Sequence, residues 1–133
     1  MPIVEHDQQP WTETRPGVQW RFIAGRATSD VEDHIGPGLT MFHQAFEPGY
    51  GVPRHLHTSG DEILTILEGE AEVLLDKEAR LAGVGASIVV PAGTVHSFRN
   101  TGPGRLEVQC VLNVDAMRAE FLEDPQAVPA PYR

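Results

Sequence analysis

The stretch PRHLHTSGDEILTILEGE, residues 53–70, carries two histidines two positions apart and a glutamate five positions after the second. In a β-strand, side chains two positions apart share a face and lie about 6.5–7 Å apart. Pro53 and the turn-forming residues TSGD favour extended chain followed by a reversal. Glu62 then opens the next strand beside His55 and His57. Imidazole nitrogens and carboxylate oxygens are common metal ligands, so the stretch predicts a ligand-bearing hairpin. The two histidines could also be polar residues of an ordinary strand.

A second stretch, GASIVVPAGTVHSFRN at residues 85–100, adds a fourth candidate ligand. The turn Pro91-Ala92-Gly93 comes before it, and its glycine lets the chain turn back tightly. In the strand that follows, alternation places His96, Phe98 and Asn100 on one face. This strand can therefore lie beside the hairpin and bring a third imidazole to the same place.

The spacing of the two stretches resembles the two signature motifs of the cupin superfamily. The first stretch reads Gly49-x5-His55-x-His57-x4-Glu62-x6-Gly69, and the second reads Gly85-x5-Pro91-x-Gly93-x2-His96-x3-Asn100. Residues 70–84 separate the motifs, and no anchor position of either motif is missing. Two complete motifs at a fitting separation are a more specific signal than either motif alone.

The resemblance implies an all-β fold, a single antiparallel jelly-roll barrel. It also implies that His55, His57, Glu62 and His96 hold one divalent transition-metal ion, which could be Fe, Mn, Ni, Cu, Co or Zn. Some members of the superfamily keep the fold and lose the metal, usually with altered ligand positions. Here all four positions are present, so we expect the ion. By the same resemblance, Asn100 and the motif glycines are structural.

The rest of the chain reads as short strands. Thirteen glycines and eleven prolines separate apolar runs, a pattern typical of a sandwich or barrel. The expected strands are 18–27, 39–47, 53–57, 62–68, 70–76, 79–82, 86–90, 95–100 and 105–114. Asp115 as N-cap and an apolar stripe predict a short helix over 115–122. We expect one domain over 1–133, with an N-terminal arm at 1–17 and a C-terminal helix and tail at 115–133.

Composition excludes several classes of function. The net charge is −9, and the ten basic residues are scattered, so we expect neither nucleic acid nor an anionic membrane surface as a partner. No apolar run approaches the roughly 20 residues of a spanning helix. The single cysteine, Cys110, stands in an apolar strand and is expected to be a buried thiol. The absence of cysteine pairs fits a cytoplasmic protein.

The strand at 62–68 is apolar on both faces, and the run IVV at 88–90 behaves in the same way. A sheet with one solvated face would alternate apolar and polar residues. Something must therefore cover the outer face of these strands. The N-terminal segment with Trp11 and Trp20 could do so, and so could a second subunit. We predict a homodimer.

Three histidines and one carboxylate leave coordination positions open on a five- or six-coordinate ion, which is typical of catalytic sites. We favour dioxygenase-type chemistry on a small organic molecule. A Lewis-acid isomerase or cyclase is an alternative, as is a non-catalytic cupin that binds a sugar-like ligand. If Glu62 is not ligated it could serve as the base, and His43 is a second candidate, for which a hydrogen-bonded core or surface histidine is the alternative. The residues expected to line the substrate cavity are Met41, His43, Phe98 and Gln109.

Overall fold

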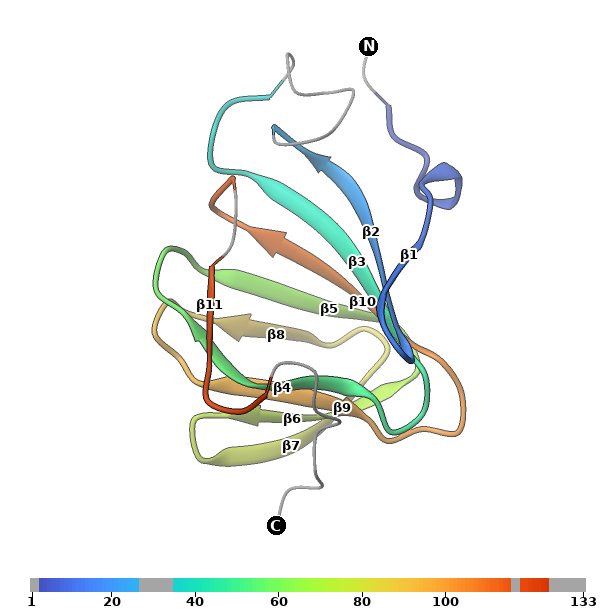
Figure 1. Ribbon diagram of the computed structural model, residues 1–133, viewed down its shortest axis with the longest axis vertical. Helices are drawn as coiled ribbons and strands as arrows, with labels where there is room; N and C mark the ends of the chain where they lie inside the picture. Colours follow the sequence, from blue (N-terminus) through green and yellow to red (C-terminus); the bar gives the residue numbers. More distant parts are fainter. Residues whose placement is uncertain (1–2, 27–34, 116–117, 125–133) are drawn as a thin grey trace.

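The computed structural model describes residues 3–26, 35–115 and 118–124, which form strands and one single-turn 3-10 helix, η1 (His6–Gln8) (Figure 1). The strands are β1 (Thr12–Arg15), β2 (Val18–Gly25), β3 (Thr40–Phe46), β4 (Gly51–His57), β5 (Glu62–Glu68), β6 (Glu70–Leu75), β7 (Glu78–Gly83), β8 (Ser87–Val90), β9 (His96–Asn100), β10 (Leu106–Leu112) and β11 (Ala119–Phe121). All nine strands expected from the sequence are present, and the all-β prediction is confirmed.

The strands form two antiparallel sheets. One sheet has the order β1-β2-β3-β10-β5-β8 and the other has the order β11-β4-β9-β6-β7. Side chains from the two inner faces meet in one apolar core, which includes Phe46, Leu64, Phe98, Val108 and Cys110. Along β10 every second residue is buried, because neighbouring side chains of a strand point to opposite faces. No helix of the described residues is long and apolar enough to cross a membrane.

The N-terminal arm covers part of the outer face of the first sheet. Trp11 stacks on the guanidinium of Arg21 at 4.4 Å and on that of Arg105 at 4.7 Å. The ring of His6 meets the ring of His43 edge to face at 4.9 Å. This cover supports the expectation that the arm shields outer residues, but it does not extend over the whole sheet. Among the outer residues of β5 and β8, Ile63, Leu67 and Val89 are 44%, 40% and 61% exposed.

The helix expected over 115–122 is wrong for the residues that the structure describes. Ala119–Phe121 form β11, which pairs antiparallel with β4, while residues 116–117 lie outside the described residues. The physical reason is that so short a helix gains few hydrogen bonds for the cost of its nucleation. The free edge of β4 instead gives hydrogen-bond partners to the backbone N–H and C=O groups of Ala119–Phe121. A backbone bond from the N–H of Leu122 to the carbonyl of Arg54 (2.9 Å) extends this pairing.

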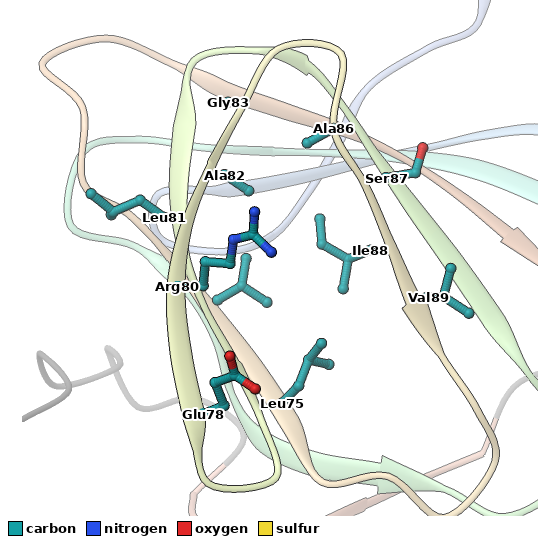
Figure 2. A pocket seen from close by; sticks show the side chains of 11 residues that line it. Leu75, Glu78, Arg80, Leu81, Ala82, Gly83, Ala86, Ser87, Ile88 and Val89 are labelled. Carbon is teal, nitrogen blue, oxygen red and sulfur yellow. The ribbon is translucent and has the colours of Figure 1, made fainter.

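The sandwich is open along one side, because β8 ends the first sheet and β7 ends the second. A cavity of about 580 Å³ lies between these two strands. Figure 2 shows Arg80 and Glu78 of β7 projecting toward this space, with Leu75 and Ile88 among its apolar walls. None of the three motif histidines lines it. The opening is therefore separate from the site that the histidines form.

Candidate metal centre

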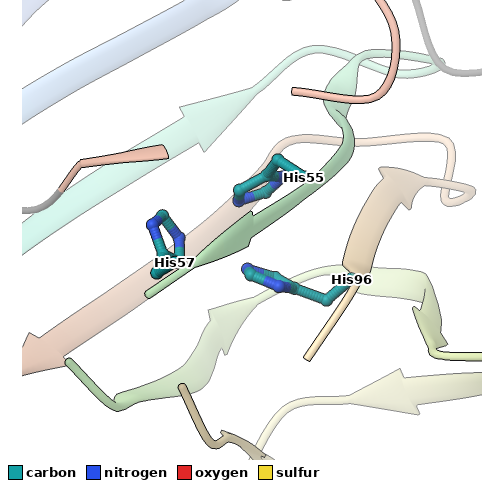
Figure 3. Close-up of side chains that lie close together, drawn as sticks. All are labelled: His55, His57 and His96. Atoms are coloured by element: carbon teal, nitrogen blue, oxygen red, sulfur yellow. The ribbon is translucent and has the colours of Figure 1, made fainter. Parts of the chain in front are cut away.

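The three motif histidines converge inside the sandwich. One nitrogen from each of His55, His57 and His96 lies within 4.8 Å of the other two, and all three side chains are buried. Figure 3 shows the rings of His55 and His57 projecting from β4 toward the ring of His96 from β9. The two strands are neighbours, with His55 directly opposite His96. The convergence predicted from the two sequence stretches is thus present.

The pairing of β4 with β9 is irregular at this point. The pairing of β4 with β9 shifts register between Val52 and His55. Pro53 lies within this interval and has no N–H to donate to the ladder, so it is found at bulges and edges rather than in regular pairing. Its carbonyl oxygen instead lies 2.7 Å from Nδ1 of His55. The proline therefore breaks the ladder and orients the first histidine ring.

The same device orients all three rings, since each Nδ1 faces a backbone carbonyl oxygen. The pairs are His55 with Pro53 at 2.7 Å, His57 with Arg118 at 3.2 Å and His96 with Thr94 at 2.9 Å. A carbonyl oxygen can only accept, so each Nδ1 carries the proton and donates it. The lone pair of each neutral ring is then on Nε2. Metal-binding histidines are commonly held in this way.

Charge and burial fit a cation as well. Burial in apolar surroundings lowers the pKa of His55 to about 3, with the neighbouring His96 adding to the effect. Burial also lowers the pKa of His57, while Glu62 acts in the opposite direction. Among the described residues, Nε2 of His96 is buried without a hydrogen-bond partner. An orphaned buried acceptor costs free energy unless something binds it, and a cation is such a partner.

Glu62 borders the histidines from the opposite sheet. Its Oε1 lies 3.6 Å from Nε2 of His96 and 4.0 Å from Nε2 of His57. Two atoms that each lie about 2.1 Å from one tetrahedral ion are roughly 3.4 Å apart, so these separations are close to those of shared ligands. The carboxylate is 5% exposed. The cluster of three imidazoles is therefore compatible with a divalent ion, and the Glu62 carboxylate stands beside it.

The predicted cavity residues lie elsewhere. In the register of β3 with β10, Met41 is opposite Val111 and His43 is opposite Gln109, on the face that alternates with core residues such as Phe46. His43 is buried there, and its Nε2 lies 3.1 Å from the Gln109 amide oxygen. The structure thus places Met41, His43 and Gln109 on the opposite side of the sheet from the histidine cluster.

Phe98 faces inward as expected, but its surroundings are apolar. Its ring meets the ring of Phe46 edge to face at 5.1 Å, within the core. On the same face of β9, Asn100 donates to the carbonyls of Phe46 (2.9 Å) and Gly104 (2.8 Å) and accepts from the N–H of Gly102 (3.0 Å). These bonds give Asn100 the structural role that the cupin resemblance implied.

The motif glycines stand where the backbone needs them. Gly49, Gly69, Gly85 and Gly93 have φ angles of 87°, 83°, 89° and 84°. Such left-handed values are strained for residues with a Cβ atom. The turns at both ends of the first motif, and those at Gly85 and Gly93 in the second, therefore require glycine, and they bound the ligand-bearing strands.

One group near the site was missed by the sequence analysis. In β11, the ring of Phe121 stacks on His55 with centroids 5.1 Å apart and an interplanar angle of 24°, and the carbonyl of Arg118 holds His57. Trp20, which the sequence suggested as cover for the outer face, lies instead on the inward face of the first sheet, where it packs against Phe22 and Phe42. Strand parity could have identified the aromatic group, because Phe42 alternates with Met41 and His43.

Cys110 is fully buried, as expected, and burial raises the pKa of its thiol well above its usual value. A buried thiol that stays protonated is a poor nucleophile and a poor metal ligand. The cysteine therefore contributes to the core rather than to the site.

Comparison with known sequences points to one family. The sequence model of the family described as "Cupin domain" matches residues 42–114. Over 66 residues the chain is 32% identical to the HTH-type transcriptional regulator PuuR of Escherichia coli (strain K12) and of Shigella flexneri. The match covers 50% of this chain and 36% of the regulator. The chain thus spans about a third of the length of these curated relatives.

Solved structures share the fold. KdgF from Halomonas sp. superposes with a TM-score of 0.71 at 23% identity, covering 85% of this chain and 94% of KdgF. Oxalate decarboxylase from Bacillus subtilis gives 0.70 at 20% identity, covering 87% and 30%. Oxalate oxidase in complex with glycolate gives 0.66 at 23% identity, covering 82% and 57%. At these identities the likeness concerns the fold alone.

Proposed function

Because the chain belongs to the cupin family, we propose that it binds one divalent transition-metal ion through His55, His57 and His96, with Glu62 as the fourth ligand. The observation that supports this most strongly is the convergence of three imidazoles whose Nδ1 atoms are all tied to carbonyl oxygens. The unpartnered Nε2 of His96 supports it independently. Fe, Mn, Ni, Cu, Co and Zn all accept such nitrogen and oxygen ligands.

We further propose that the protein is a metalloenzyme acting on a small organic molecule, with dioxygenase-type chemistry favoured. When bound, the ion would supply an open position for substrate and either redox or Lewis-acid chemistry. The chain's own residues would fix the imidazoles and enclose the site within the sandwich. If Glu62 is not ligated, its Oε1 can take up a proton beside the substrate. Two of the similar structures are by name enzymes of oxalate, which is consistent with a small substrate rich in oxygen atoms.

The test separates the reaction classes. Elemental analysis of the purified protein should find close to one transition-metal ion per chain. His57→Ala and His96→Ala should lose it, and metal retained by both variants would end the assignment. Oxygen uptake by the iron- or copper-loaded protein, with a panel of enolisable and phenolic substrates, would support dioxygenase chemistry. Turnover of the same panel without oxygen uptake would favour an isomerase or cyclase.

A non-catalytic small-molecule binder is the alternative function, and one observation favours it. The curated relatives that match half of this chain are transcriptional regulators, which are not named as enzymes. A binder would hold a sugar-like or other small ligand unchanged. Calorimetric titration with a ligand library, followed by mass analysis of the recovered ligand, distinguishes the two. An unaltered ligand in the presence of bound metal and oxygen favours the binder.

We also propose a homodimer formed through the outer face of β5 and β8. The arm shields the side of the sheet near His43, whereas Ile63, Leu67 and Val89 stay exposed. Apolar side chains that gather on one face are typical of interaction surfaces. Light scattering should report twice the chain mass of 14.6 kDa. Val89→Glu should give the monomer. Leu39→Glu, which changes an exposed apolar residue outside β5 and β8, should not. A wild-type monomer would end the proposal of a homodimer.

We also propose that the protein is cytoplasmic.

A further inference from the structure

The strand β11 contacts two of the three histidines of the site. In its pairing with β4, Phe121 is opposite His55 and Ala119 is opposite His57. Phe121 stacks its ring on His55, with an interplanar angle of 24°. The carbonyl oxygen of Arg118, just before the strand, lies 3.2 Å from Nδ1 of His57. One short segment therefore orients two rings through two different contacts.

The same segment is held weakly. β11 has three residues, all exposed, and it stands at the end of the second sheet with β4 as its partner there. The segment is also attached by the backbone bond from Leu122 to Arg54 and by an ion pair between Glu123 and Arg54. Exposed ion pairs contribute little, and short edge strands open at low free energy. Docking of β11 is therefore an equilibrium that small contributions can shift.

The contacts to the histidines couple this equilibrium to the site. While β11 is docked, the Arg118 carbonyl keeps the proton of His57 on Nδ1 and leaves Nε2 free to bind. The Phe121 ring is stacked on one face of the His55 ring and limits its rotation. When β11 leaves β4, both constraints are lost. The docked state presents a better ordered set of nitrogens, and a ligand that prefers one state shifts the population toward it.

We infer that residues 118–124 form a clasp whose docking on β4 and the binding of the metal ion favour each other, with Phe121 as a positioning residue for His55. This inference rests on the proposed metal centre. Coupling between two binding events is reciprocal. The ion should therefore stabilise the clasp, and the clasp should raise the affinity for the ion by the same factor.

The first test measures metal affinity. Co²⁺ is titrated into the metal-free protein and followed by its visible absorption, with a competing chelator. Phe121→Ala should weaken Co²⁺ binding about tenfold, the lower end of the range for groups that orient metal-binding histidines. Phe121→Tyr keeps the ring face and should bind as the wild type does. Leu122→Ala is the matched control, since Leu122 is 53% exposed and its backbone bond survives the change.

The second test measures the clasp itself. Hydrogen exchange of residues 118–124 should slow when Co²⁺ is added to the wild-type protein, because the backbone bonds of β11 open less often. Glu123→Gln removes the ion pair with Arg54 without touching a histidine. It should speed exchange in the metal-free protein and weaken Co²⁺ binding by no more than the same factor. Phe121 is 37% exposed, so its variants should fold.

The outcomes separate this inference from the proposed function. If the wild-type protein binds no Co²⁺, the metal centre and the clasp both fall. A second outcome is that the wild type and Phe121→Ala bind Co²⁺ equally well, and that the rate of hydrogen exchange at 118–124 does not change when Co²⁺ is added. In that case the metal centre stands and the clasp is overturned. Weaker binding in Leu122→Ala equal to that in Phe121→Ala would also overturn the role of the ring.

Discussion

The substitution His96→Ala tests the metal centre through stability, without knowledge of the substrate. An ion that binds only the folded protein stabilises it according to its free concentration. At 100 times the dissociation constant, the gain is about 2.7 kcal/mol. For a chain of this length, such a gain raises the melting temperature by roughly 10 °C. The wild-type protein should therefore show a rise of this size when Zn²⁺ is added.

The variant should lose this rise, because His96 supplies the buried Nε2 that has no other described partner. In the metal-free protein, removal of a ring that is 1% exposed should cost about 1–3 kcal/mol. The loss should lie toward the lower end, since the substitution also removes an unsatisfied buried nitrogen. The metal-dependent and metal-independent effects are thus separable in one pair of melting curves.

His43→Ala is the matched control. His43 is also 1% exposed, but it lies on the outer face, where Gln109 and Arg21 bond to it. Its removal takes a hydrogen-bond partner from each of them, although Arg21 keeps its ion pair with Glu107, and should lower the melting temperature of the metal-free protein. The rise on adding Zn²⁺ should remain. Calorimetry of the three proteins, with and without Zn²⁺, is sufficient. An unchanged rise in His96→Ala, or its loss in His43→Ala, would refute the reasoning.

Three further predictions concern acid, backbone space and charge. Burial lowers the pKa of His55 to about 3, so between this value and pH 6.5 the unfolded chain binds more protons than the folded chain. The free energy of unfolding of the metal-free protein should therefore fall by about 1.4 kcal/mol for each unit by which the pH drops through this range. Equal urea midpoints at pH 7 and pH 5 would contradict this. A Cβ at Gly51 would lie 1.9 Å from the Phe98 carbonyl oxygen, so Gly51→Ala should cost about 3 kcal/mol or more in chemical unfolding. Gly83→Ala, with open space around it, should be nearly neutral, and equal costs would argue against this packing. Glu62→Gln should keep the fold by circular dichroism and weaken Zn²⁺ binding in a chelator competition, and unaltered affinity would exclude Glu62 as a ligand.

The regular part of the fold was predictable because its signals are local. Apolar runs between turns rich in glycine and proline predict the nine expected strands. Glycine and proline favour turns through their own backbone preferences, whatever the rest of the fold. The two missed strands lie at sheet edges. β1 reads TETR and has no apolar alternation, and β11 reads AEF within a stretch of helical periodicity. Both are strands because a neighbouring strand has a free edge, and that edge is not encoded in their own residues.

The cavity residues show a second limit. β3 reads TMFHQAF and has large side chains on both faces, so its pattern does not tell which face meets the core. Folding places Phe42 inward, and the N-terminal arm covers the outward His43. A histidine on a strand is polar in sequence, but it is buried here because a distant segment packs over it and Gln109 satisfies its Nε2.

The sequence alone determined the ligand-bearing hairpin and the third imidazole, since strand alternation and glycine turns act over a few residues and need no distant partner. Only the tertiary structure decided what surrounds them. The proton on each Nδ1 depends on a carbonyl oxygen, and for His57 that carbonyl belongs to Arg118, 61 residues away. The stacking partner of His55 likewise comes from β11. Such contacts arise from the packing of segments remote in sequence, so the tertiary structure is needed to find them.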